Sequence, residues 1–408
     1  MRIGTKGEHR LTYCTNIHPG ETLEDVTDNL TTYTVPLKAL VSPSDAMGVG
    51  LRLSNQAVAE LVGDEAKLER FEQLLLDHDL YVFTLNGFPY GSFHRQRVKD
   101  DVYRPDWRDD ERLQYTLRLI EVLARLLPDG EEGSISTSPL SYKPWLDLDV
   151  ERQSAFRAGA EHLAAAAFQL FDLRNRTAQL LHIGIEPEPD CLIENTPETI
   201  AFFEEWLFRS GAKYLRREYG LSKSQAEDIL RTHIGVCYDT CHFAVEFETP
   251  EEVLSGFRSA GIRLSKLQIS AALRVPLDVR PRDELESALE PFAESTYLHQ
   301  VVARSADGSL HRYPDLPDAL PKLGDEEAEE WRIHYHVPIF IDAFQQLRST
   351  QDDIRPALTG TLQDDFCRHL EIETYTWDVL PEEMKTDIVT SIEREYAWVL
   401  ENVPGGPA

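Results

Sequence analysis

The chain has 408 residues, a formal net charge of −30 and a hydrophobic content of 42%. This hydrophobic content supports a large core and argues against wholesale disorder, and the length suits one elaborated barrel or two ordinary domains. The acidic surface repels nucleic acid phosphates, so a DNA- or RNA-binding role is disfavoured.

The apolar runs, the amino-terminal segment and the cysteines indicate in which cellular compartment the protein is expected. No run of 18 uncharged apolar residues occurs, so no membrane span is expected. The polar start, residues 1–10, has no apolar stretch typical of a secretory signal, and a cytoplasmic protein is expected. The five cysteines are odd in number and widely spread, which favours reduced thiols over a disulfide framework.

Short apolar runs alternate with longer helical stretches, which is the pattern of βα units around a parallel sheet. The predicted strands, in chain order, are 11–16, 48–53, 81–86, 134–138, 180–186, 233–239, 264–270 and 369–375. The predicted helices are 21–40, 56–77, 111–127, 149–179, 197–219, 223–231 and 382–403. This regular alternation predicts an α/β fold, a single (β/α)8 TIM barrel over residues 1–408.

One segment before strand eight breaks the rhythm. Two further β-like runs, 297–304 and 332–340, flank an acidic stretch that contains Asp307-Gly308, a hairpin-turn signal. We therefore predict an inserted β-rich segment at 297–340, within the barrel sequence.

The loop after strand three, 87–107, is rich in aromatic residues and glycine. Aromatic side chains shelter apolar parts of a ligand, and the neighbouring basic residues can hold an anionic one. We predict that Asn86, Tyr103 and Trp107 bind substrate under this loop. The alternative is an ordinary packed surface loop.

Oxygen-bearing side chains lie at the ends of the last four predicted strands. In a barrel, the carboxyl ends of the strands build the site, and these ends carry Glu186, Asp239, Gln268 and Glu373. Three converging carboxylates need a counter-charge to stay ionised. We predict that the four residues bind one divalent metal ion, with magnesium or manganese suited to the oxygens and zinc or cobalt admitted by nearby imidazoles.

Each carboxylate also has a simpler interpretation. Glu186 or Glu373 alone could be a buried acid paired with lysine or arginine, and Asp239 alone could cap the next helix. Glu371 shares a strand face with Glu373. We predict Glu373 as the ligand because it lies nearer the carboxyl end of the strand, with Glu371 as its supporting partner.

The histidines add a second group of candidates. His242 follows Asp239 by three residues, and His334 and His336 alternate on one strand face. We predict His242, His299 and His336 as catalytic residues together with Glu186 and Glu373. His334 and His18 are predicted to bind substrate. The alternative for each histidine is an ordinary polar position on a loop or strand.

These residues resemble the xylose isomerase-like sugar-phosphate isomerase/epimerase barrels. That family usually places Glu, Asp, His and Glu on strands five to eight around one divalent metal, and Gln268 stands here where His is usual. The segments that carry the resemblance are Glu186, Tyr238-Asp239-Thr240-Cys241-His242, Leu267-Gln268-Ile269-Ser270 and Glu373.

A closer resemblance is to the EboE-type metabolite traffic proteins. It implies a cytoplasmic barrel that works with other proteins of a pathway that prepares or exports a small metabolite. The segments are Asn86-Gly87-Phe88-Pro89-Tyr90-Gly91, Val102-Tyr103-Arg104-Pro105-Asp106-Trp107, His334-Tyr335-His336-Val337-Pro338-Ile339-Phe340 and Glu371-Ile372-Glu373-Thr374-Tyr375-Thr376-Trp377.

Three functions follow as hypotheses. The first is a metal-dependent isomerase or epimerase that acts on a small polyhydroxylated or carbonyl metabolite. The second is a metabolite-binding or handover protein with a vestigial metal site, motivated by Gln268. The third, an abasic-site endonuclease, is disfavoured by the charge of −30. Acidic barrels of this size are often dimers, so a homodimer is also considered.

Overall fold

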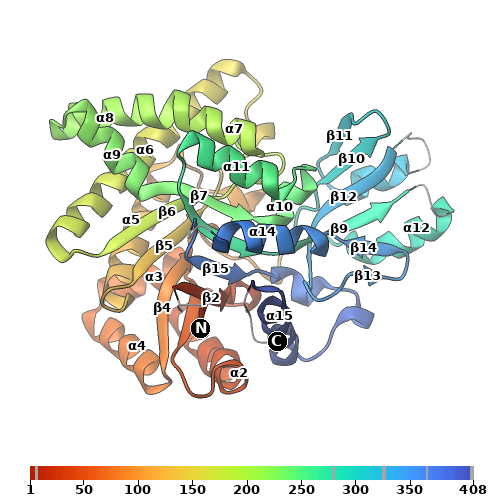
Figure 1. Cartoon of the computed structure of the whole chain (residues 1–408), viewed down its shortest axis with the longest axis horizontal. Helices are drawn as coiled ribbons and strands as arrows, with labels where there is room; N and C mark the ends of the chain where they lie inside the picture. Colours follow the sequence, from red (N-terminus) through yellow and green to blue (C-terminus); the bar gives the residue numbers. More distant parts are fainter. Residues whose placement is uncertain (5–7, 278–280, 324–327, 364–365, 405–408) are drawn as a thin grey trace.

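The computed structural model describes residues 1–4, 8–277, 281–323, 328–363 and 366–404, and it contains the predicted parallel barrel (Figure 1). The neighbouring parallel strands follow the order β2-β15-β8-β7-β6-β5-β4-β3. Their bounds are β2 His9–Tyr13, β3 Met47–Arg52, β4 Leu80–Asn86, β5 Glu132–Thr137, β6 Leu180–Ile185, β7 Ile234–Asp239, β8 Leu264–Ile269 and β15 His369–Ile372. The short strand β1 (Arg2–Ile3) pairs antiparallel with β2. The fold prediction is confirmed.

The barrel closes between β2 and β3 largely through threonine side chains. Cys14 and Gly50 form an isolated parallel bridge. The Thr12 hydroxyl accepts a hydrogen bond from Gly50 N at 2.8 Å and lies 3.0 Å from Gly48 O, to which it can donate. Further along, Thr15 Oγ1 accepts from Arg52 N at 2.9 Å. These hydroxyls satisfy backbone groups that a regular ladder would otherwise pair.

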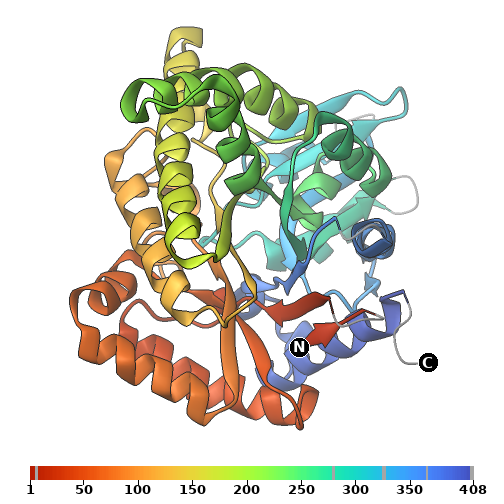
Figure 2. The same ribbon diagram turned by 60° about the vertical axis from the view of Figure 1, so that its left-hand side comes forward.

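Helices cover the outside of the barrel, as both ribbon views show (Figures 1 and 2). Their bounds are α1 Leu23–Asn29, α2 Val35–Val41, α3 Asn55–Gly63, α4 Glu65–Asp77, α5 Asp110–Leu126, α6 Asp149–Thr177, α7 Thr196–Ala201, α8 Ala212–Tyr219, α9 Lys223–His233, α10 Thr240–Val245, α11 Pro250–Ala260, α14 Gln351–Gln363 and α15 Ile388–Asn402. Within the described ranges, no helix combines the length and the apolar character that crossing a membrane requires.

Three predicted helices are interrupted. The stretch 21–40 contains the π-helical turn η2 (Leu30–Thr34), and 197–219 contains η5 (Phe202–Gly211). The stretch 56–77 breaks at Asp64, whose side chain accepts from Lys67 N and so caps α4. An aspartate that competes for backbone donors favours such a new helix start.

A second, antiparallel sheet lies beside the barrel and has the order β11-β10-β12-β9-β14-β13 (Figure 1). Its strands are β9 Ala271–Pro276, β10 Val301–Ser305, β11 Leu310–Tyr313, β12 Ala328–Val337, β13 Ala343–Phe344 and β14 Leu347–Ser349, with the short helices α12 (Arg282–Leu289) and α13 (Leu316–Ala319) among them.

The second sheet extends beyond the predicted segment 297–340 on both sides. Strand β9 follows β8 after a single residue, Ser270, so the apolar run at 264–276 shows no break in the sequence. The Asp307-Gly308 turn joins β10 to β11, where Gly308 has a φ of +84° and Asp307 Oδ1 accepts from Ser309 N.

Candidate metal centre

Three of the four predicted ligands meet at the carboxyl ends of the strands. Glu186 follows β6, Asp239 ends β7, and Glu373 follows β15. All three side chains are buried, and one carboxylate oxygen from each lies within 4.8 Å of those of the other two. The register of the parallel barrel brings together residues that are 187 positions apart in the sequence.

Asp239 has two roles. Its Oδ1 atom accepts hydrogen bonds from Cys241 N at 2.8 Å, from His242 N at 3.2 Å and from Ser270 Oγ at 2.6 Å. Asp239 therefore caps α10, as the simpler interpretation required. Its Oδ2 atom has no hydrogen-bond partner among the described residues, and it remains available to a cation.

Glu373 and Glu186 are held differently. Glu373 Oε1 accepts from Asn16 Nδ2 at 2.7 Å and from Asn86 Nδ2 at 3.1 Å. Glu186 Oε1 lies 4.0 Å from His242 Nδ1, and its Oε2 has no partner in the described part of the chain. Two asparagines therefore fix one carboxylate, while the other keeps a buried oxygen unsatisfied.

The crowding of these acids changes their protonation. Burial, together with Asp239, raises the pKa of Glu186 well above its usual value, and burial and Glu186 do the same to the pKa of Glu373. Burial also acts to raise the pKa of Asp239, but His242, His336 and the Ser270 hydrogen bond outweigh it, so this pKa is lowered. Two unpartnered buried oxygens among three acids fit a divalent cation.

Gln268, the fourth predicted ligand, points elsewhere. It pairs in register with Asp239, but its Oε1 accepts a hydrogen bond from Cys237 Sγ at 2.9 Å. Its Nε2 has no partner among the described residues. Metal binding by Gln268 therefore stays a prediction, and it requires the amide to turn away from Cys237.

Glu371 is separated from the three acids by its own counter-charge. Its Oε2 lies 2.7 Å from Lys266 Nζ, and both side chains are fully buried. The two glutamates at positions 371 and 373 therefore have different partners. Glu371 is neutralised by a lysine inside the barrel, whereas Glu373 has only amide partners besides the other acids.

A layer of histidines covers the acids. Each of His242, His334 and His336 has its Nδ1 against an oxygen, namely Pro187 O at 3.0 Å, Gln300 Oε1 at 2.8 Å and Glu373 O at 2.8 Å. Burial lowers the pKa of His242 to about 4 and lowers those of the other two. Neutral rings with Nδ1 engaged present an Nε2 lone pair, which is how metal-binding histidines are usually oriented.

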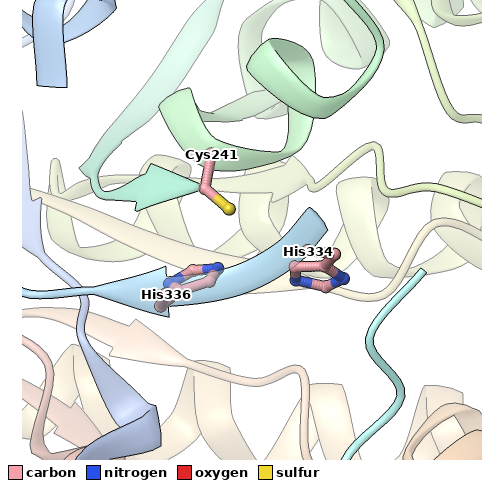
Figure 3. A group of neighbouring side chains, drawn as sticks. All are labelled: Cys241, His334 and His336. Carbon is pink, nitrogen blue, oxygen red and sulfur yellow. The ribbon is translucent and has the colours of Figure 1, made fainter. Parts of the chain in front are cut away.

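The layer offers further ligand groups. Glu188, His242 and His334 form one such group, and Asp239, His242 and His336 form another. Figure 3 shows the Cys241 side chain directed from α10 toward β12, which carries His334 and His336. Burial raises the pKa of the Cys241 thiol well above its usual value, so it is protonated in this arrangement.

Sequence reasoning missed Glu188. This buried side chain accepts a hydrogen bond from Tyr103 OH at 2.9 Å and lies 3.5 Å from His334 Nδ1. Burial raises the pKa of Glu188 to about 8, although the Tyr103 hydrogen bond acts in the opposite direction. The signal was present in the run Glu186-Pro187-Glu188-Pro189, where a second acid follows the strand end.

Glu186 and Glu373, but not Asp239, line a cavity of about 50 Å³. Of the predicted substrate-binding and catalytic residues, Asn86, Tyr103, Glu186, His242, His334 and Glu373 line it. The remaining lining residues are Asn16, Phe88, Pro89, Phe93, Val98, Lys99, Val102, Glu188, Tyr297, Leu298 and Tyr375.

Four predicted substrate-binding or catalytic residues are not among those that line this cavity, namely His18, Trp107, His299 and His336, and their roles stay predictions. Both nitrogens of His299 are engaged, with Glu294 Oε1 at 2.8 Å and His334 O at 3.1 Å. His18 stacks on Tyr33 with ring centroids 4.3 Å apart, beside a different cavity. Trp107 belongs to the main core and donates to Thr137 Oγ1 at 3.1 Å. Contacts with these neighbouring residues fix the positions of the three rings.

The solved structures that match this chain have little sequence in common with it. A xylose isomerase-like TIM barrel protein from Mycobacterium smegmatis, in complex with magnesium, matches with a TM-score of 0.52 and 11% identity over 100% of both chains. IOLI protein with a bound zinc atom matches at 0.49 and 10% identity over 98% of this chain and 99% of that one. The probable 3-DHS dehydratase AsbF of petrobactin synthesis, from Bacillus anthracis, matches at 0.46 and 11% over 96% and 98%.

No family model and no curated protein matches the sequence. The structural likeness to the Mycobacterium smegmatis protein shows a shared xylose isomerase-like TIM-barrel fold.

Proposed function

From the xylose isomerase-like fold and the buried acids at its mouth, we propose a divalent-metal-dependent isomerase or epimerase that acts on a small polyhydroxylated or carbonyl metabolite. The observation that carries the proposal is the group Glu186, Asp239 and Glu373, in which Glu186 Oε2 and Asp239 Oδ2 are buried without a partner among the described residues.

Glu186, Asp239 and Glu373 would hold one divalent ion, with Gln268 joining them if its amide turns. The oxygens suit magnesium or manganese, and the histidines above them admit zinc or cobalt. When bound, such an ion polarises adjacent carbonyl and hydroxyl oxygens of a substrate.

The proton transfer is assigned to side chains that face the cavity. Glu186 and Glu373 are our candidates for moving a proton between neighbouring carbons. Glu188 adds a third carboxyl at the cavity wall, held by Tyr103. His242, which lines the cavity, and His336, whose ring centroid lies 5.6 Å from that of His242, would orient the substrate, since their Nδ1 atoms lie against backbone carbonyls.

Metal content and proton exchange test this function. We expect about one divalent ion per purified full-length chain. In deuterated water, NMR should detect solvent exchange of a carbon-bound proton in at least one member of a panel of ketoses and keto acids. Asp239→Asn and Glu373→Gln should lose both properties. Glu395→Gln, which changes a buried glutamate outside the cavity, is the matched control. Full metal occupancy in both site variants would refute the assignment.

The second candidate is a metabolite-binding or handover protein. It is favoured by the engagement of Gln268 Oε1 with Cys237, which leaves fewer oxygens for the ion. Thermal stabilisation by a panel member without proton exchange would support this candidate over catalysis.

We further propose that the protein is cytoplasmic and works with other proteins of a metabolite biosynthesis or export pathway, as the EboE-type resemblance implies. A homodimer is part of this proposal. Light scattering on the purified chain tests the dimer, and co-purification with a tagged full-length chain from its own cells tests the partners.

A further inference from the structure

The cavity above the acids has apolar walls made by two aromatic clusters. Phe88, Tyr103 and Tyr142 form one cluster, and Leu298 packs against it. Phe93, Val98, Tyr297 and Tyr375 form the other. Val102 packs against both, and neither cluster is part of the main core. The cavity thus has carboxylates, amides and imidazoles at one end and apolar side chains around the rest.

The tyrosine hydroxyls on these walls are largely turned away from a ligand. Tyr103 OH donates to Glu188, and Tyr297 OH is 2.8 Å from His94 Nδ1. Tyr103 and Tyr142 stack with centroids 5.0 Å apart. The rings of Tyr103 and Tyr297 therefore provide apolar surface to the cavity, and their hydroxyls are used within the protein.

The charge of the cavity opposes an anionic ligand. Lys99 is the single lysine or arginine among its described lining residues. Its Nζ is already bound by Asp315 Oδ2 at 2.6 Å, Tyr297 O at 2.6 Å and Glu294 O at 3.2 Å. Beyond the proposed ion, recognition of phosphate needs a free cationic side chain or a set of backbone donors. The lining offers Glu186, Glu188 and Glu373 instead.

We propose that the substrate is a neutral molecule with two adjacent oxygens at one end and an apolar ring or chain as its remaining part, and that sugar phosphates are excluded. The oxygenated end rests on the proposed function, because the ion and the amides of Asn16 and Asn86 would receive it. The apolar part rests on the walls alone.

Two matched ligand pairs test the proposal by calorimetry on the manganese-loaded full chain. The first pair is 2-hydroxycyclohexanone and its 4-propyl derivative. Burial of apolar carbon contributes about fourfold in affinity per methylene, so the propyl compound should bind at least tenfold more tightly. The second pair is dihydroxyacetone and dihydroxyacetone phosphate, and the phosphate should bind more weakly. Tighter binding of the phosphate, or no gain from the propyl group, would overturn the proposal.

A variant of the wall separates the apolar effect from the metal site. Val102→Thr keeps the shape of a side chain that touches both clusters but adds a hydroxyl. It should reduce the propyl advantage severalfold and leave manganese content unchanged. The control is Val389→Thr on α15. Val389 is also half-buried, but it packs against the main core, so this variant should leave the propyl advantage intact.

The outcomes distinguish this proposal from the proposed function. Manganese bound without any propyl advantage would overturn the substrate class and leave the metal enzyme standing. A propyl advantage in a chain that binds no divalent metal when manganese is offered would support the apolar pocket and refute the metal-dependent reaction.

Discussion

Gly50 and Glu371 approach so closely that a Cβ atom on Gly50 would lie 1.9 Å from Glu371 Oε1. The same Cβ would lie 2.7 Å from the backbone oxygen of Tyr13. Gly50 is at the seam where the barrel closes, and Glu371 fills the interior beside it. The absence of a side chain at position 50 is therefore a condition for closing the barrel around a buried charge.

Gly50→Ala should destabilise the protein by about 3 kcal/mol, because a buried carboxylate and a backbone carbonyl both oppose the methyl group. Urea denaturation followed by circular dichroism measures the change. Gly63→Ala is the control, since a Cβ there meets nothing within 4 Å. Equal stability of the two variants would contradict the packing at the seam.

The ion pair of Glu371 and Lys266 leads to a second prediction. Either Glu371→Leu or Lys266→Met leaves one buried charge uncompensated and should cost about 3–5 kcal/mol. The double variant removes both charges and should be more stable than either single variant. A double-mutant cycle by urea denaturation measures the coupling. Additive losses would mean that the two groups do not compensate each other.

Metal-free Glu186→Gln protein should be more stable than the metal-free parent at pH 8. Because the pKa of Glu186 is raised in the folded state, the parent binds a proton there that its unfolded chain lacks, so its stability falls as the pH rises above the unfolded pKa. The neutral amide avoids this loss. Thermal unfolding in EDTA at pH 4 and pH 8 measures the difference, which should vanish at pH 4.

The same variant should respond oppositely to metal. Manganese at 100 times its dissociation constant stabilises a folded protein by about 2.7 kcal/mol, and the parent should gain this amount. Glu186→Gln should gain much less, because one ligand is lost. Equal stabilisation of both proteins by manganese would remove Glu186 from the ion site.

The barrel was predictable because its signal is repeated. The first and last residues of each parallel barrel strand lie within three residues of the predicted ones. Buried parallel strands appear in the sequence as short apolar runs between helices. The convergence of Glu186, Asp239 and Glu373 follows from the strand ends alone. No distant partner had to be known to place these three.

The other residues of the site could not be placed from the sequence, because their contacts follow no repeating sequence pattern. Glu188 lies in the turn after β6, where no strand rule applies, and its direction is set by Tyr103. His299 precedes β10 and turns toward Glu294, so the strand face could not be inferred for it. Trp107 is an aromatic residue of a loop, and only its contact with Thr137 shows that it packs inward.

Glu395 gives a last prediction, outside the cavity. Its buried Oε1 accepts from Thr374 Oγ1 at 2.7 Å and from Ile339 N at 3.3 Å, and burial raises the pKa of Glu395 to about 7 against those hydrogen bonds. Between the unfolded value of 4.5 and about 7 the folded state binds the extra proton, so this group's contribution to stability declines as the pH rises through that window.

Glu395→Gln retains an acceptor for both donors and carries no charge. It should match the parent near pH 4 and exceed it at pH 8 by up to about 3 kcal/mol. Chemical denaturation across this pH range measures the difference. If the difference in stability between the parent and Glu395→Gln is the same at both pH values, burial does not hold the proton on Glu395.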